Sequence, residues 1–364
     1  MIKKKLLGSL AALALFLTVG AKAAPVHAAS MSRYVTELLC KNHMRGAVTV
    51  VENGRSKTIG VGYANYGRRI KNSGRAVYPA ASLQKAVTAA MLMQVMRESR
   101  GKKHFTANTK ISKWYPRLKS AKQITVSDLL THTSGYYVYN LEDSRKKVYT
   151  EKGAIDWTIN QVNSTWQYPV GSYHYNDTNY MLLAGIIQKQ TGKSYAYNLR
   201  KRIVKKLRLT HTCLRENLPS SLHLAKSYLY LGRNYQAPVL LPKSVASQMP
   251  GAGDLISTPY EYLQIQRGLH NGKLLSKKQF SEMTHMPSKA TTYCGGIYLK
   301  KSGKVKLAYG SIAYEHYATY YQLTTDNRYG MVMFLNQRNA SENQVKAVGY
   351  QILSRIKAGT FARK

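Results

Sequence analysis

The sequence predicts an α+β fold in which one antiparallel sheet, flanked by helices, is assembled from both chain ends around an inserted helical lobe. Strand-like segments fall near the N-terminus, at residues 47–63, and again near the C-terminus, at residues 295–336. The long middle of the chain carries helix-like apolar runs instead. The 364 residues suit one large domain or two closely packed lobes.

The N-terminus has the composition of a secretory signal peptide. Three consecutive lysines at residues 3–5 precede an apolar run to residue 21, and small residues around Ala28 suit signal peptidase. An uncleaved anchor is the alternative, although the run is short for a membrane span. We therefore expect residues 1–28 to be a signal peptide and residues 30–360 to form the folded domain. The expected location is secreted, in the cell wall or at the outer face of the cytoplasmic membrane.

The charge of the chain points to an anionic partner. Lys and Arg number 55 against 16 Asp and Glu, which gives a formal net charge of +39. The first 28 residues hold four lysines and no acid, so the remainder carries +35. An exported protein meets little nucleic acid, so anionic cell-wall polymers or lipid head groups are the expected partners. A generally cationic composition without a specific partner is the alternative.

Three cysteines, Cys40, Cys213 and Cys294, are an odd number without metal-ligand spacing. They imply no disulfide framework, and buried thiols are expected. The sequence has no metal cluster and no nucleotide-binding loop, so no cofactor is expected.

The first elements are a helix and a hairpin. Residues 32–41 have the pattern of an amphipathic helix. Residues 47–51 and 58–63 are strand-like and flank Asn53-Gly54, a strong turn signal. They predict the first two strands of the sheet.

Residues 80–85 (Ala-Ala-Ser-Leu-Gln-Lys) begin the most distinctive helix. The run that follows, residues 86–96, contains no charge, Gly or Pro, which predicts a helix buried on most of its faces. Ser82 and Lys85 are three residues apart and therefore share one helix face.

This pair predicts a serine nucleophile that works without histidine. Desolvation lowers the pKa of a buried lysine, and neutral Lys85 could take a proton from Ser82. The alternative is that Ser82 caps the helix and Lys85 extends to solvent. Ser-x-x-Lys recurs at residues 99–102, 144–147 and 354–357, but only Ser82 begins a buried helix.

The remaining elements follow from apolar periodicity and turn residues. Helices are expected at residues 124–130, 181–187, 195–207, 260–268 and 341–356, and Gly192 ends one of them. Strands are expected at residues 295–299, 305–309, 317–324 and 329–336.

Several of these stretches resemble the serine beta-lactamase and penicillin-binding-protein-like hydrolases, in the branch of class C beta-lactamases, DD-peptidases and D-alanyl esterases. The matching stretches are residues 81–85, 124–135 (Ile-Thr-Val-Ser-Asp-Leu-Leu-Thr-His-Thr-Ser-Gly), 173–180, 251–258 and 328–333. They span nearly the whole chain in the family's order. The resemblance implies a beta-lactamase/DD-peptidase-like fold and a serine hydrolase domain over residues 30–360.

The resemblance also implies roles for individual residues. Ser82 would form an acyl-enzyme, Lys85 would accept its proton, and Tyr175 would pass the proton to the leaving group. A phenol needs a nearby cation for this role, because a cation lowers its pKa; otherwise Tyr175 is one more tyrosine in a chain with 29 of them. The oxyanion hole would use the N–H groups of Ser82 and of a residue near Ser311. His132 belongs to a supporting turn in this family and is not expected to act as a base.

Two departures from the family pattern bear on the substrate. The Tyr-x-Asn motif reads Tyr-Asn-Asp here and places Asp177 in the site. The third motif, Lys-Thr-Gly or His-x-Gly in the family, is matched best by Ala308, Tyr309 and Gly310, with an uncertainty of one residue in register. The expected substrate-binding residues are therefore Asp177, Tyr309, Gly310 and Ser311, and the motif lacks its cation.

A site with an extra carboxylate and no motif cation suits an acyl donor that carries an ammonium and no carboxylate. D-alanyl esters of teichoic or lipoteichoic acid fit, and these polyphosphates also match the basic charge. The expected function is therefore an exported D-alanyl esterase. The alternatives are a D-Ala-D-Ala carboxypeptidase or penicillin-binding protein acting on peptidoglycan stems, and a catalytically idle, cationic wall-binding protein.

Overall fold

The computed structural model describes residues 30–139, 147–286, 290–312, 316–338 and 341–359. The expected signal peptide, residues 1–28, lies outside the described residues, so it stays a prediction. None of the helices in the described ranges combines the length and apolar character needed to cross a membrane.

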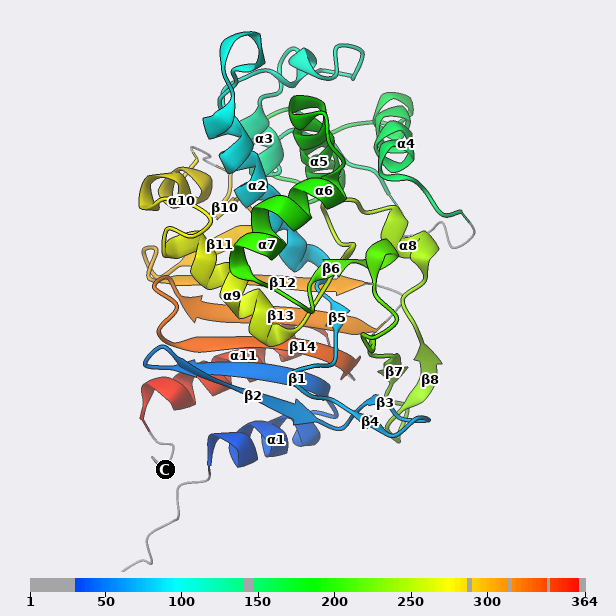
Figure 1. The fold of residues 1–364 in the computed structure, drawn as a ribbon, viewed down its shortest axis with the longest axis vertical. Helices are drawn as coiled ribbons and strands as arrows, with labels where there is room; N and C mark the ends of the chain where they lie inside the picture. The colour runs from blue at the N-terminus through cyan, green and yellow to red at the C-terminus, as the bar shows by residue number, and fades with distance from the viewer. Residues whose placement is uncertain (1–29, 140–146, 287–289, 313–315, 339–340, 360–364) are drawn as a thin grey trace, which may run out of the picture.

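A nine-stranded sheet runs through the described part of the molecule, and both chain ends contribute to it (Figure 1). The strands lie side by side in the order β10 (Tyr293–Cys294), β11 (Ile297–Lys300), β12 (Val305–Ile312), β13 (Tyr317–Thr324), β14 (Gly330–Arg338), β1 (Arg45–Glu52) and β2 (Arg55–Val61). At the far end of β14, β7 (Ser227–Leu229) pairs with it in parallel and β8 (Gln236–Val239) pairs with β7.

The two chain ends meet where β1 pairs antiparallel with β14, with Val48 opposite Met333. The β1–β2 hairpin turns at Asn53 and Gly54, whose φ angles of 52° and 77° are both left-handed. Two left-handed residues are what a tight hairpin turn requires, and Asn-Gly supplies them at low cost. The predicted α+β fold with a sheet built from both termini is confirmed.

Helices cover both faces of the sheet. On one face, α1 (Met31–Lys41) and α11 (Glu342–Lys357) enclose an apolar cluster with side chains of β1, β13 and β14. The helical lobe packs over the other face, and α9 (Pro259–His270) contacts β14 and β1 there. The other helices of the lobe are α2 (Gln84–Glu98), α3 (Val126–Leu130), α4 (Glu151–Ser164), α5 (Thr178–Thr191), α6 (Tyr195–Leu199), α7 (Lys205–Leu207), α8 (Lys243–Ser247) and α10 (Lys277–Thr284).

Short elements join these layers. Two small sheets pair β3 (Tyr63–Asn65) with β4 (Ile70–Lys71), and β9 (Leu255–Ser257) with β5 (Tyr78–Pro79) and β6 (Cys213–Leu214). Single helical turns lie at η1 (Ala81–Leu83), η2 (Gly101–Lys103), η3 (Ile111–Lys113) and η5 (Arg215–Asn217), and a π-helical segment, η4 (Arg200–Val204), joins α6 to α7.

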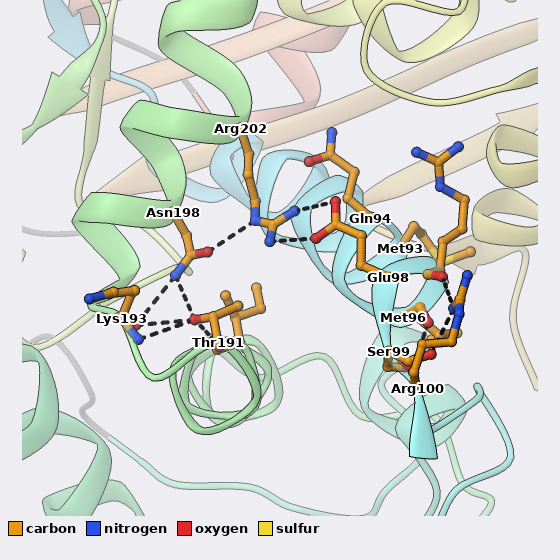
Figure 2. Close-up of polar contacts among 12 residues, drawn as sticks. Met93, Gln94, Met96, Glu98, Ser99, Arg100, Thr191, Lys193, Asn198 and Arg202 are labelled. Carbon is orange, nitrogen blue, oxygen red and sulfur yellow. Dashed lines mark hydrogen bonds and ion pairs between the residues drawn. The ribbon is translucent and has the colours of Figure 1, made fainter. Parts of the chain in front are cut away.

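The central helix α2 is buried from its first residue to Val95 and packs against α5, as the uninterrupted apolar run predicted. Its far end is tied to the lobe by polar contacts (Figure 2). Glu98 accepts two hydrogen bonds from Arg202, at 2.9 and 2.7 Å, and Asn198 accepts a third from the same guanidinium at 3.0 Å. These contacts fix the C-terminal end of α2, the end that lies away from Ser82.

Three expectations require correction. The helix expected over residues 195–207 is interrupted by η4. No helix was expected over residues 151–164, where the structure has α4. All three cysteines lie in described ranges and are unpaired, but Cys40 is exposed and Cys213 is half-buried, so only Cys294 is the expected buried thiol.

Candidate active site

The chain approaches Ser82 through a strained turn. Ala81 has a φ of 47°, in the left-handed region that costs a non-glycine residue about 1–2 kcal/mol. Ser82 then sits within η1, which leads directly into α2, and its side chain makes no capping hydrogen bond. Its Oγ instead lies 2.9 Å from the Nζ of Lys85, which donates a hydrogen bond to it. The capping alternative for Ser82 is therefore wrong.

Lys85 is fully buried, so it does not reach solvent either. Besides Ser82, its Nζ lies 2.6 Å from Oδ1 of Asp177 and donates to the carbonyl oxygen of Ala252 at 3.1 Å. Two hydrogen-bond acceptors and one carboxylate thus surround the Lys85 amine. The geometry therefore matches a charged lysine.

The resting charge of Lys85 differs from the sequence-based prediction of a neutral amine. Burial lowers the pKa of Lys85, but Coulomb attraction to Asp177, with contributions from Tyr175, outweighs burial and leaves the pKa raised. Lys306 provides the contrast: burial lowers its pKa to about 7 although the charge of Asp326 acts in the opposite direction, and its Nζ donates a hydrogen bond to the carbonyl oxygen of Gln266. The carboxylate beside Lys85 is thus what reverses the effect of burial.

Tyr175 lies close to Lys85, with its ring centre 5.0 Å from Nζ. Burial raises the pKa of the Tyr175 phenol; the charge of Lys85 and hydrogen bonds to Lys85 and Ser82 lower it, but the net pKa remains raised. The ring packs against His132, 4.4 Å between centres, and edge-on against Tyr293. His132 itself accepts a hydrogen bond at Nδ1 from the backbone of Asn176. His132 therefore supports the turn that carries Tyr175.

The turn at residues 251–254 fixes the beginning of α2. Gln84 donates to the Asp254 carboxyl and accepts from the backbone of Leu255, while Thr88 donates to the carbonyl of Gly251. Burial raises the pKa of Asp254 to about 7. The same turn presents the Ala252 carbonyl to Lys85, which explains why the 251–258 stretch belongs with the site.

The third motif borders Ser82 along an open edge of β12. β11 pairs with β12 only up to Leu307, so on that edge the β12 residues beyond Leu307 face η1 instead of another strand, while their other edge pairs with β13. A Cβ built on Gly310 would lie 2.8 Å from the backbone nitrogen of Ser82. This contact fixes the register that the sequence left uncertain by one residue and sets Ser311 next to it.

One cavity of about 520 Å³ contains all the predicted site residues except Lys85, which lies directly beneath Ser82. Its lining consists of Ser82, Tyr175, Asp177, Tyr293, Gly296, Tyr298, Lys300, Leu307, Ala308, Tyr309, Gly310, Ser311, Glu342, Lys346 and Tyr350. No group of three or more His, Cys, Asp or Glu side chains is placed to hold a metal ion in the described ranges.

The sequence analysis missed the wall contributed by β11 and α11. Two lysines line it, Lys300 on β11 and Lys346 on α11. The third motif itself lacks a cation, but these two lysines supply positive charge elsewhere in the cavity. No sequence signal could have found these lysines, because only the sheet and the final helix bring them to one cavity.

Gly296, in the turn between β10 and β11, provides a stability test of the contact between this turn and α2. Its φ is 79°, and a Cβ there would lie 2.2 Å from the backbone nitrogen of Ala86. Gly296→Ala is expected to destabilise the protein by about 2–3 kcal/mol, measured by urea unfolding. The matched control is Gly303→Ala, with a φ of 80° and no atom within 4 Å of the new Cβ. Equal losses in both variants would mean that the backbone angle and not the contact with α2 is responsible.

Ser82 is hydrogen-bonded to a buried lysine that pairs with a carboxylate. A tyrosine lies over the lysine, and an open strand edge lies beside the serine. This is the arrangement of the serine–lysine acyl hydrolases. The profile of the beta-lactamase family matches residues 31–352. The chain belongs to this family and is a serine hydrolase.

Known relatives agree with this assignment. The teichoic acid D-alanine hydrolase of Staphylococcus aureus is 28% identical over 329 residues, which cover 89% of this chain and 78% of the relative. The crystal structure of FmtA from S. aureus superposes with a TM-score of 0.74 at 27% identity, covering 89% of each chain. The D-amino acid amidase of Ochrobactrum anthropi shares the fold at 21% identity, with a TM-score of 0.75 and 90% and 99% of the two chains covered.

Proposed function

We propose that this protein is an exported esterase that removes D-alanyl groups from teichoic or lipoteichoic acid through an acyl-enzyme on Ser82. The observation that carries the proposal is the carboxylate of Asp177, which lines the cavity and lies 2.6 Å from Lys85. An amide at this position could not pair with an ammonium in the same way, whereas a carboxylate can. The similarity to a teichoic acid D-alanine hydrolase supports the same substrate class.

In this proposal Asp177 binds the ammonium of the D-alanyl group. The incoming cation shares the carboxylate that held Lys85 and adds positive charge beside it, and both effects lower the pKa of Lys85. Lys85 then releases a proton to solvent by way of the Tyr175 hydroxyl, because Tyr175 contacts Lys85 and lines the cavity, and Lys85 becomes a neutral amine. Substrate binding thereby converts the resting ammonium into a base.

Neutral Lys85 accepts the proton of Ser82 as Oγ bonds to the ester carbonyl carbon. The resulting oxyanion is stabilised by the backbone N–H groups of Ser82 and Ser311. The bond to the polymer oxygen then breaks, and Tyr175 donates a proton to that oxygen and regains one from Lys85. Water attacks the D-alanyl ester of Ser82 in the same way, releasing D-alanine and restoring the serine.

The basic charge and the N-terminal segment support the proposed setting. The formal charge of +35 beyond residue 28 favours association with a polyphosphate, and the signal-like residues 1–28 would export the protein to it. We place the protein at the cell wall or the outer face of the cytoplasmic membrane, in contact with the polymer and anionic lipid head groups.

One observation favours a second candidate, a D-Ala-D-Ala carboxypeptidase or penicillin-binding protein. Lys300 and Lys346 line the cavity and could hold the carboxylate of a peptidoglycan stem. The third alternative, an idle wall-binding protein, is disfavoured because Ser82, Lys85 and Tyr175 meet in one intact constellation.

Release of D-alanine is the decisive measurement. The purified protein without residues 1–28 is expected to release D-alanine from lipoteichoic acid and not from a stem peptide ending in D-Ala-D-Ala. Ser82→Ala is expected to abolish release, because it removes the nucleophile. Mass spectrometry of a quenched reaction should show the D-alanyl adduct on Ser82.

The other outcomes are equally informative. Release from the peptide only, with covalent labelling by a fluorescent penicillin, would establish the carboxypeptidase. Release that persists in Ser82→Ala would refute the acyl-enzyme. Release from neither substrate would return the idle binding protein to consideration.

A further inference from the structure

The catalytic cavity extends past the nucleophile around the open edge of β12. Ser82, Tyr175 and Asp177 line one end, and the other end is walled by β11 and α11. The cavity reaches this wall along β12, whose residues from Leu307 to Ser311 also line it. A D-alanyl group occupies only the space around Ser82, so the far end remains for the group that bears the ester.

The two ends of the cavity carry opposite charge patterns. The near end presents Asp177, and the far end presents Lys300 and Lys346 with one acid, Glu342. Lys346 pairs with Glu342 on the same helix, and its Nζ lies 5.5 Å from the ring centre of Tyr309. Lys300 is exposed and lies 5.9 Å from the ring centre of Tyr298.

The aromatic side chains hold both lysines at the cavity. Tyr309 receives a hydrogen bond from Arg338 at 2.9 Å, which fixes the ring beneath Lys346. Tyr298 shares a 2.9 Å hydrogen bond with Tyr173, two residues from Tyr175, which ties β11 to the segment carrying the catalytic tyrosine. The far end therefore presents two lysines, each next to a tyrosine ring that is held by a hydrogen bond, and it is open to solvent.

We propose that Lys300 and Lys346 bind a backbone phosphodiester of the polymer beside the esterified unit. This inference rests on the proposed esterase function and specifies its substrate as a polyol phosphate recognised at two points. Asp177 takes the ammonium of the acyl group, and the two lysines take the anion on the alcohol side of the scissile bond. Lysine ammonium groups bind phosphate oxygens as point charges, and partial exposure makes the contact sensitive to salt.

The test compares two double variants that each remove two positive charges. Lys300→Ala/Lys346→Ala alters the far end of the cavity. Lys193→Ala/Lys201→Ala alters a second cation-lined cavity near the distal end of α2, where Lys193 and Arg202 lie (Figure 2). All four side chains are exposed or half-exposed, so both variants should fold, and thermal unfolding checks this.

The expected result is a change confined to the first variant and to the polymer. Its KM for D-alanylated lipoteichoic acid should rise about 10-fold with kcat little changed, and its KM for D-alanyl glycerol, which has no phosphate, should not move. Inhibition by de-esterified poly(glycerol phosphate) should weaken by a similar factor. Wild type and the Lys193/Lys201 variant should behave alike on all three measurements.

Three results would overturn the proposal. Equal effects in both double variants would mean general attraction of a polyanion. An equal loss on D-alanyl glycerol would mean that the lysines support the chemistry. A raised KM for a D-Ala-D-Ala peptide and not for the polymer would assign the lysines to a peptide carboxylate. If the wild type cleaves only the peptide, the proposed esterase function is wrong. Inhibition of peptide cleavage by poly(glycerol phosphate) then tests the lysine site separately, because weaker inhibition of the first variant would still support phosphate binding.

Discussion

Replacing Lys85 with arginine is expected to lower kcat for D-alanyl ester hydrolysis by about 10³-fold or more, a loss typical of removing a general base that activates a nucleophile. Arginine keeps the positive charge that Asp177 requires but cannot be deprotonated in proteins. The variant therefore separates two roles of Lys85, the counter-charge of a buried carboxylate and the acceptor of the Ser82 proton. The measurement is kcat on D-alanyl glycerol, with thermal unfolding as the check on folding.

Lys85→Met is the matched companion, because it removes both roles. It is expected to be at least as inactive as the arginine variant and less stable, since Asp177 loses its partner within 2.6 Å. If Lys85→Arg retained a tenth or more of wild-type activity, Lys85 would act through its charge alone and the proton from Ser82 would go elsewhere.

Local sequence signals predicted much of the fold. Asn53-Gly54 fixed the first hairpin because few dipeptides accept two left-handed residues, and the uncharged run after Lys85 left α2 no exposed face. Helix α4 was missed because its buried residues are few, Ala154, Ile155, Thr158 and Val162, and polar residues separate them. Such a helix depends on α5 beside it more than on its own pattern.

In the active site, too, local contacts could be predicted from the sequence and long-range contacts could not. Ser82 and Lys85 lie three residues apart, so their contact is local and predictable. The charge of Lys85 depends on Asp177, 92 positions along the chain, and burial alone therefore gave the wrong direction for its pKa. Lys300 and Lys346 meet at one cavity only through the strand order and the position of α11, and neither leaves a local pattern.

Replacing Asp177 with asparagine is expected to lower the plateau value of kcat/KM for D-alanyl glycerol, above the acid limb of the pH profile, by about 10- to 100-fold, because one charge-assisted contact to the substrate ammonium is lost. The N-acetylated ester, which carries no ammonium, should lose much less. The control is therefore the same Asp177→Asn variant assayed on the ester without an ammonium. Undiminished activity of both Asp177→Asn and Asp177→Ala on the charged ester would refute ammonium recognition by Asp177.

The pH profile of the same variant tests the second role of Asp177. The carboxylate raises the pKa of Lys85, and only the neutral amine accepts a proton, so the acid limb of kcat/KM follows Lys85 in the free enzyme. Removing the negative charge leaves burial, Tyr175, Tyr180 and the neutral His132 around the lysine. The pKa of Lys85 should then fall, as burial lowers the pKa of Lys306. The acid limb of kcat/KM should therefore move to lower pH with both substrates. An unmoved limb would mean that Lys85 is not the group whose deprotonation starts the reaction.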